Sequence, residues 1–256
     1  MSLTPEQERI KADFIAARGE EAWNAAWDAT LRIDPPFVAA SLAMQQVPAR
    51  GRHLSARFHA LCRISVNAAA THLNVPQILP HVRAALDEGA TPHEILEVLE
   101  LASTLGIHTM NIGVPLLVEV LEERGRTAPS QLGDEQLRLK AEFTSVRGYW
   151  HDFWNEMLEL DPEMFEAYTE FSTVPWRTGT LTPAEKELIY ISYDIAATHL
   201  YVPGTKLHIR NALDHGATPE QILEVMEISS VLGIHAVTTA VPVLAAELAA
   251  RGLTAR

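Results

Sequence analysis

The chain of 256 residues contains a single cysteine, Cys62. One thiol can form neither an intrachain disulfide nor a dithiol redox pair, so chemistry that needs two thiols in one chain is excluded. Cys62 lies in the segment A-L-C-R-I-S-V, which is typical of a helix face. This setting favours a buried, unreactive thiol.

Basic residues are also scarce, because 20 Lys and Arg stand against 33 Asp and Glu, for a net charge of −13. Such a charge argues against nucleic acid or an anionic membrane surface as the main partner, and an anionic substrate would need a local basic group. No uninterrupted apolar run approaches the roughly 18 residues of a membrane span. The N-terminal segment mixes charged and apolar side chains and lacks the apolar core of a signal peptide. We therefore expect a soluble, cytoplasmic protein that binds a small-molecule substrate, with no nucleic acid or membrane as partner.

Strand signals are missing as well, since apolar and polar residues rarely alternate and no hairpin dipeptide separates β-branched runs. Helix signals are frequent instead. Thr91, Thr182 and Thr218 each precede a proline and begin a capping box, and Ile95 and Leu99 belong to an apolar pattern with the period of a helix. The sequence therefore predicts an all-α fold.

A segment of the first half recurs in the second half at a spacing of 127 residues. Thr71–His108 and Thr198–His235 align without a gap and are identical at 24 of 38 positions. A polar segment, residues 124–134, separates the halves and is typical of a linker. This pattern predicts a tandem duplication of one helical unit, with repeats at residues 1–126 and 127–256.

Each copy carries three histidines at matching positions. They are His72, His81 and His108 in the first repeat and His199, His208 and His235 in the second. A repeated fold has no structural need for three imidazoles. The first histidine lies near the end of one helix, the second begins the next helix after a turn that contains proline, and the third ends an apolar helix that must pack against this pair. The three histidines of each repeat can therefore converge.

Converging imidazoles suit three roles, which the sequence leaves open. Imidazole is the usual general acid or base near neutral pH. Three neutral imidazoles of one repeat can instead bind a divalent transition metal, although the H-x₈-H spacing is not an established ligand signature. The histidines can also simply cap helices and bond buried carbonyl groups. No cofactor is expected unless a metal binds at the histidines.

An arginine follows the second histidine by two residues in each copy. Arg83 and Arg210 can hold a substrate carboxylate through bidentate hydrogen bonds. The alternative is a solvated ion pair with the aspartate four residues further on, Asp87 or Asp214.

Two positions differ between the copies in a chemically informative way. Glu187 aligns with Ala60, and Tyr201 aligns with Asn74. Glu187 can tune the protonation of a second-repeat histidine, or it can be a plain first-turn carboxylate that the helix dipole favours. These differences indicate that the two repeats are not chemically equal.

The pattern H-x-R-x-A-L-x-x-G-A-T-P-x-x-I-L-E-V occurs twice, at His81–Val98 and at His208–Val225. Together with the preceding helix, E-L-I-Y-I-S-Y-D-I-A-A-T in the second copy, it resembles the carboxymuconolactone decarboxylase and alkylhydroperoxidase D-like superfamily. The resemblance covers about 50 residues of each half. It implies a helical unit that assembles into homo-oligomers, with active pockets near subunit or repeat interfaces.

The superfamily has two chemical branches. The peroxidase branch places a C-x-x-C pair just before the second histidine, and this chain has no cysteine there. A thiol peroxidase is therefore excluded, because no other group replaces the thiolate. The decarboxylase branch retains the second histidine, which corresponds to His81 and His208. The chain departs from both branches in a turn about two residues longer, in the additional first and third histidines, and in its two copies.

The resemblance implies a cofactor-independent lyase that acts on a small carboxylated lactone or a related intermediate of aromatic catabolism, with His208 as the primary acid or base. The expected roles of the other second-repeat residues are carbonyl polarisation for His199 and His235, carboxylate orientation for Arg210, and tuning of protonation for Tyr201 or Glu187. The first-repeat set, His72, His81, His108 and Arg83, would form a second site or a degenerate scaffold. The alternatives are a metal-dependent hydrolase or lyase and a non-catalytic helical oligomer that binds a small molecule.

Overall fold

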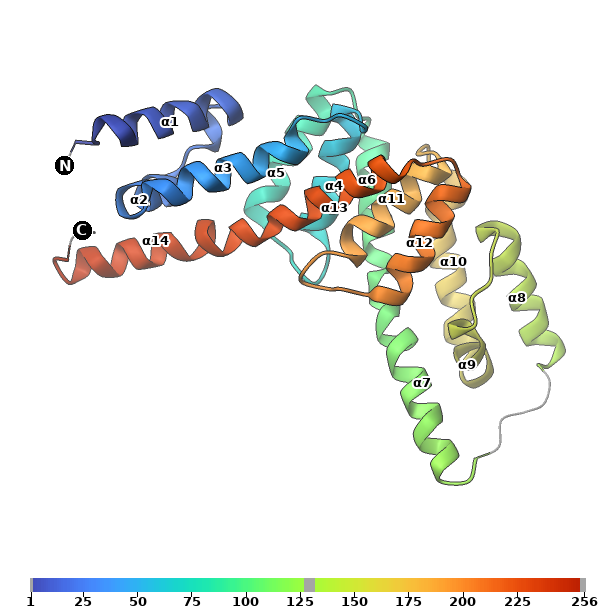
Figure 1. The fold of residues 1–256 in the computed structure, drawn as a ribbon. Coiled ribbons are helices and arrows are strands. Elements are labelled where there is room, and N and C mark those ends of the chain that lie inside the picture. The colour runs from blue at the N-terminus through green and yellow to red at the C-terminus, as the bar shows by residue number, and fades with distance from the viewer. Residues whose placement is uncertain (1, 127–131, 254–256) are drawn as a thin grey trace.

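The computed structural model describes residues 2–126 and 132–253, so part of the predicted linker lies outside the described residues. Within them the regular elements are helices, with no strand (Figure 1). The first repeat consists of α1 (Pro5–Arg18), η1 (Glu20–Ala22), α2 (Ala25–Ile33), α3 (Pro35–Ala49), α4 (Ala56–Ala68), α5 (Val75–Asp87), α6 (Pro92–Ser103), η2 (Thr104–Ile107) and α7 (His108–Glu123). The second consists of α8 (Asp134–Arg147), α9 (Phe153–Leu160), α10 (Pro162–Thr178), α11 (Pro183–Asp194), α12 (Val202–Asp214), α13 (Pro219–Ser230), η3 (Val231–Ile234) and α14 (His235–Ala250). The predicted all-α tandem duplication is confirmed.

The sequence signals for helix starts agree with the structure. Thr91, Thr182 and Thr218 each cap a helix through the hydroxyl, and a Glu or Gln three residues later closes the capping box. These reciprocal bonds satisfy backbone N–H groups that have no partner within the helix. They fix where α6, α11 and α13 begin.

Helices of both repeats share the central core. α4 and α6 pack against α11 and α13 around buried side chains such as Leu61, Ile64 and Ile189. Ser65 and Ser192, which occupy equivalent positions 127 residues apart, form a hydrogen bond of 3.1 Å with each other. A bond between two equivalent residues lies on the axis that relates the repeats, so the molecule has an internal pseudo-twofold axis.

A buried ion pair on one side of this axis and a buried contact between a histidine and a carboxylate on the other side join the repeats. Lys186 Nζ lies 3.1 Å from Glu97 Oε1, and at the equivalent positions His59 Nε2 lies 3.7 Å from Glu224 Oε1. Cys62 is fully buried close by, and burial raises the pKa of its thiol. The expectation of a buried cysteine is therefore confirmed.

The last helix of each repeat packs against the other repeat. α7 contacts α9, where Val114 and Val118 join a cluster around Trp154 and Phe165. α14 contacts α2 in the same way, and Figure 1 shows it running beside α2 and α3. The histidine at the start of each of these helices is thereby carried into the neighbourhood of the other repeat.

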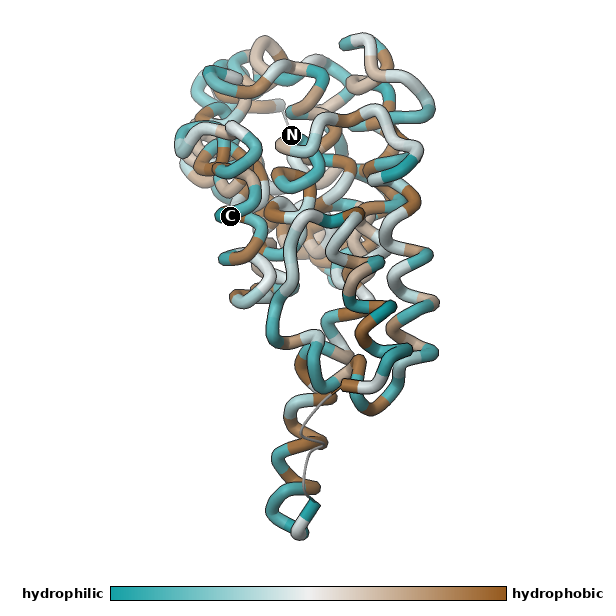
Figure 2. Tube along the Cα trace, turned by 90° about the vertical axis from the view of Figure 1, so that its right-hand side faces the viewer, coloured by the Kyte–Doolittle hydropathy of each residue, from teal (hydrophilic) through white to brown (hydrophobic). Residues whose placement is uncertain are grey.

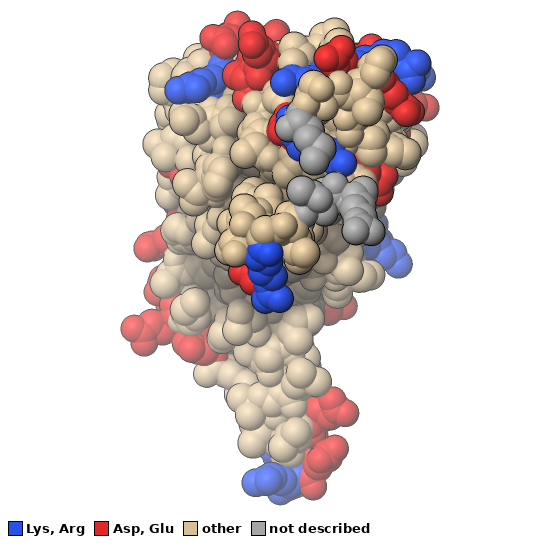
Figure 3. Space-filling model, turned by 90° about the vertical axis from the view of Figure 1, so that its left-hand side faces the viewer, with Lys and Arg blue, Asp and Glu red and all other residues tan. Residues whose placement is uncertain are grey.

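Each repeat contains one long, apolar helical stretch. Pro92–Glu123 and Pro219–Ala250, of 32 residues each, are long and apolar enough to cross a membrane by length and composition alone, a test that core helices of soluble proteins also meet. Figure 2 shows apolar residues along the protruding part of α7. On α14, Val243 is 71% exposed and Leu244 47%. Figure 3 shows both acidic and basic side chains around the margin of one face, with mostly uncharged side chains between them.

Candidate active site

Helix α11 places two carboxylates on one face near its ends. Glu187 and Asp194 are seven residues apart, which is about two helical turns, so their side chains point in the same direction. α12 packs against α11 and brings His208 onto this face. All three side chains are buried.

Glu187 and His208 form the closest ionisable pair of the site. Glu187 Oε2 lies 2.5 Å from His208 Nδ1, and Asn211 Nδ2 donates a weak hydrogen bond of 3.4 Å to the other carboxylate oxygen. The Tyr190 ring stacks on the imidazole at 4.4 Å between centroids. These contacts fix the orientation of the ring and leave Nε2 free to face Asp194 Oδ2, at 3.9 Å. A histidine held by a carboxylate at Nδ1 can accept or deliver a proton at Nε2.

Asp194 is fully buried, and neither of its carboxylate oxygens has a hydrogen-bond partner among the described residues. Burial, and next the negative charge of Glu187, raise the pKa of Asp194 well above the ordinary value. A carboxyl group in this setting is held in its neutral form, which can donate a hydrogen bond. Gly204 makes this possible sterically, because a Cβ at that position would overlap Asp194 Oδ2. Asp194 was not predicted as a site residue, although the sequence places it two helical turns after Glu187.

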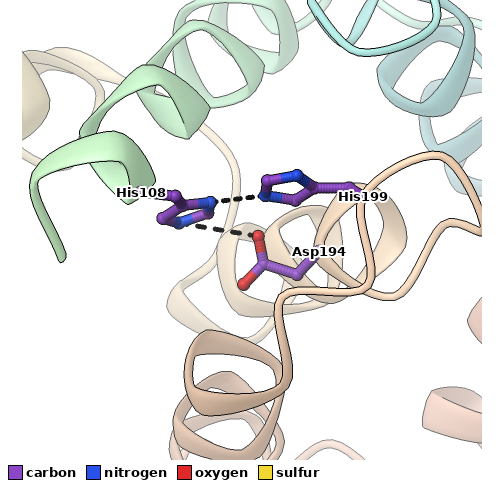
Figure 4. A group of neighbouring side chains, drawn as sticks. All are labelled: His108, Asp194 and His199. Carbon is purple, nitrogen blue, oxygen red and sulfur yellow. Dashed lines mark hydrogen bonds and ion pairs between the residues drawn. The ribbon is translucent and has the colours of Figure 1, made fainter. Parts of the chain in front are cut away.

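A pair of histidines from different repeats closes the site (Figure 4). His108 Nδ1 lies 2.6 Å from His199 Nε2, and His108 Nε2 lies 3.8 Å from Asp194 Oδ1. The His108 ring also stacks on Tyr201, with 3.8 Å between centroids. Burial, and next the neighbouring His199, lower the pKa of His108 to about 3, and burial lowers that of His199. Both rings are therefore neutral, so one donates the bond and the other accepts it.

A cavity of about 20 Å³, enough for one water molecule, lies beside His108, Tyr201 and His208. Its walls are mostly aromatic, and Arg147 is the cation that lines it. Arg147 is 5% exposed, donates a hydrogen bond of 3.1 Å to Tyr149 and lies 4.7 Å from the Trp176 ring centroid. Arg147 could not be predicted as a site residue, because nothing in its local sequence distinguishes it from an arginine in an ordinary last helical turn.

The equivalent groups of the first repeat differ. His72 Nε2 lies 2.8 Å from His235 Nδ1, which repeats the histidine pair. The carboxylates are lost, because Ala60 and Asn67 stand where the second repeat has Glu187 and Asp194. This side contains a much larger cavity, of about 660 Å³.

The expected grouping of the histidines by repeat is wrong. His235 lies with His72 rather than with His208, and His108 lies with His199, because α7 and α14 each pack against the other repeat. His235 therefore does not polarise a substrate beside His208. The metal sets expected within single repeats are replaced by another set, His108, Asp194 and His199, whose potential ligand atoms lie within 4.8 Å of one another.

The two arginines expected to bind a carboxylate lie on the surface. Arg210 is exposed and does not line the small cavity. Arg83 is also exposed and lies at the rim of the large one. In the described part of the chain, neither forms an ion pair with the aspartate four residues further on. Arg147, rather than Arg210, is the cation that lines the small cavity.

Known proteins resemble the chain in both sequence and structure. The carboxymuconolactone decarboxylase family profile matches residues 162–246, which include α11, α12 and the second-repeat site. A solved structure from Burkholderia xenovorans LB400, of a proposed gamma-carboxymuconolactone decarboxylase subunit, is 49% identical in sequence with a TM-score of 0.90. The match covers 97% of this chain and 100% of that one. The chain belongs to the carboxymuconolactone decarboxylase family. Membership of this family agrees with the resemblance seen in the sequence motif, whereas no curated protein matches significantly.

Proposed function

We propose that the chain is a cofactor-independent lyase that removes CO₂ from a small carboxylated lactone or a related product of aromatic catabolism. The contact between Glu187 and His208 carries this proposal, because it supplies a buried and oriented acid or base in the family's own motif. Family membership supports a decarboxylase-like activity. The substrate and the roles of the residues are our inference.

Decarboxylation breaks the bond between the substrate carbon and its carboxylate, and the electron pair must move into a conjugated carbonyl group. Asp194, as a neutral acid, donates a hydrogen bond to the oxygen on which this charge develops. CO₂ leaves as the bond to the carboxylate breaks, and His208 in its protonated form, held at Nδ1 by Glu187, then delivers a proton from Nε2 to the carbon. One proton from solvent then reprotonates His208 for the next turnover, so each turnover consumes one carboxylate and one proton.

The histidine pair and Arg147 complete the site around the reacting groups. His108 and His199 can relay protons between solvent and the cavity, because His199 is half-exposed and His108 is buried. Arg147 places a positive charge beside the aromatic wall, where it can attract the substrate carboxylate. The cavity must widen to admit a lactone, since it holds about one water molecule as it stands.

The test is turnover of a panel of carboxylated lactones and β-keto acids, followed as CO₂ release. We expect His208→Gln and Glu187→Gln to lower kcat by roughly 10²- to 10⁴-fold, the range for loss of a general acid or base. The matched control is His81→Gln, the same change in the first repeat, which should retain activity. Full activity of His208→Gln would disprove the assignment, and no turnover by the wild-type chain would favour a non-catalytic binding protein.

A second candidate function rests on the arrangement of His108, Asp194 and His199. Two imidazoles and one carboxylate are a donor set that suits divalent transition metals with open coordination positions. A bound metal would require the charged form of Asp194, so the two candidates differ at this residue. Metal analysis of protein purified without a histidine tag decides between them. If the chain is a metal-dependent enzyme, Asp194→Asn abolishes metal binding. If it is a cofactor-independent lyase, the metal content of the wild type and of the variant is the same.

The surface supports a further part of the proposal, that the chain forms a homo-oligomer. α3 and α10 expose apolar residues at equivalent positions, such as Met44 and Phe171, at 54% and 52%. Apolar groups repeated on one helix face favour contact with another protein surface. Light scattering at several protein concentrations tests this, and a monomer at all of them would contradict it.

A further inference from the structure

The large cavity of the first repeat is built by both repeats. Its walls come from α1, α3, α4 and α5 on one side and from α13, η3 and α14 on the other. Its volume of about 660 Å³ lies in the range of small-molecule sites. A molecule larger than one water therefore fits here without rearrangement, unlike at the second-repeat site.

Two guanidinium groups line this cavity without a negative partner. Arg18 donates a hydrogen bond to Gln45, and Arg63 Nε donates one of 3.3 Å to His59 Nδ1. In the described part of the chain neither arginine forms an ion pair. Burial lowers the pKa of Arg18, and burial together with repulsion from Arg18 lowers that of Arg63 to about 10. Two like charges that are partly removed from water and have no ion-pair partner are costly, and an anion between them would offset that cost.

The other titratable groups around the cavity do not neutralise these charges. Burial, and next the two arginines, lower the pKa of His81 to about 3, so its imidazole is neutral. His235 is neutral for the same main reason, with a pKa lowered to about 4. Glu21 and Asp87 line the cavity but are exposed and contact neither guanidinium as an ion pair. The interior of the cavity is therefore positive, within a chain of net charge −13.

The remaining walls are suited to an apolar body. Trp27 and Val66 are buried side chains on one side, and Leu232 faces them from the second repeat. Asn67 is 4% exposed, and its side-chain oxygen has no hydrogen-bond partner, so it can accept a bond from a ligand hydroxyl group. Apolar side chains and two guanidinium groups that line one cavity match an unsaturated or aromatic ring that carries two carboxylates.

We propose that this cavity is a binding site for a small organic dicarboxylate with an apolar body, held by Arg18 and Arg63 and not converted there. Conversion is not expected, because Ala60 and Asn67 replace the two carboxylates that assist His208 in the second repeat, so His81 has neither. The site is thus distinct from the proposed catalytic site, and its occupancy does not depend on the activity proposed above.

The experiment is titration of the full chain with the three benzene dicarboxylates, by calorimetry and by the fluorescence of Trp27, which lines the cavity. We expect at least one isomer to bind with a dissociation constant of about 1 mM or lower. Benzoate should bind at least about tenfold more weakly, because it leaves one guanidinium unpaired. The neutral diamide of the same isomer should not bind measurably.

Variants locate the binding. Arg63→Gln and Arg18→Gln, on different helices, should each weaken binding about tenfold or more, as expected for loss of a charge-assisted hydrogen bond. The control Arg177→Gln removes the same charge from an exposed surface pair and should leave affinity unchanged. His208→Gln should also bind normally, which separates this site from the catalytic one. No binding by the wild-type chain, equal binding of the diamide, or unchanged affinity in both cavity variants would overturn the proposal.

Discussion

His108 and His199 form a hydrogen bond of 2.6 Å although they belong to different repeats. The contact exists because α7 leaves its own repeat and packs against α9. The catalytic site proposed for the second repeat thus depends on a residue from the first. The expected effects of several substitutions therefore differ from those expected if each repeat formed its own site.

Substitution of His108 should impair the second-repeat site. We expect His108→Ala to lower kcat/KM by roughly tenfold to a hundredfold, because the proton path between His199 and Asp194 is interrupted. The control is His235→Ala, the equivalent change in the first repeat, which should alter kcat/KM by less than about threefold. Equal effects of the two substitutions would contradict the crossed arrangement.

Ionisation of Asp194 should lower the free energy of unfolding as pH rises. Its pKa is raised in the folded state, so the stability that it contributes is present below its unfolded pKa and is lost as pH rises through the folded value. Between the unfolded and the folded pKa of Asp194, the free energy of unfolding of the wild type should fall by about 1.4 kcal/mol per pH unit for this one proton. Asp194→Asn cannot ionise and should lack this component in urea unfolding across neutral and alkaline pH. Identical slopes in both proteins would show that Asp194 is charged when folded.

Protonation of His81 should lower the free energy of unfolding as pH falls. Its pKa is lowered from 6.5 to about 3 on folding, so its contribution to stability is present above pH 6.5 and is lost as pH falls toward 3. In this window each such proton lowers the free energy of unfolding by about 1.4 kcal/mol per pH unit. His81→Gln should reduce the slope by about one proton between pH 6 and pH 4.5, a value to be fitted from urea titrations. An exposed histidine variant, His53→Gln, serves as the control and should not change the slope.

Arg63 should reduce stability in the absence of ligand. Its guanidinium is largely buried next to Arg18 without a negative partner, so Arg63→Gln should raise the free energy of unfolding by about 1 kcal/mol. Addition of a bound dicarboxylate should reverse the order, because only the wild type gains the binding free energy. Thermal unfolding of both proteins with and without the ligand measures the two effects. A less stable variant under both conditions would indicate a purely structural arginine.

Much of the fold could be predicted because its signals are local. Threonine and proline mark the helix starts, and the repeated T-H-L-x-V-P motif marks the duplication. Glu187 illustrates the limit for the site. Its position in the helix allowed two interpretations, and only the packing of α12 against α11 shows that it contacts His208 rather than solvent.

The residues that were wrongly placed share one cause. His235 was expected beside His208 because both lie in one repeat. The pattern of apolar residues in α14 does not indicate which repeat this helix packs against. Helix exchange between repeats leaves the same periodicity as packing within one repeat. Arg147 and Asp194 were missed for a related reason, since burial of a charged residue depends on distant aromatic and aliphatic partners.

The hydrogen bond between Ser65 and Ser192 marks an axis that two separate, identical chains would also possess as a dimer. In such a dimer the two sites would be built from the same residues, and a substitution in one would appear in the other. Covalent linkage of the two copies removes that constraint. A change such as alanine for Glu187 can then be kept in one site alone, and a protein with one reacting site and one basic binding cavity becomes possible on a symmetric scaffold.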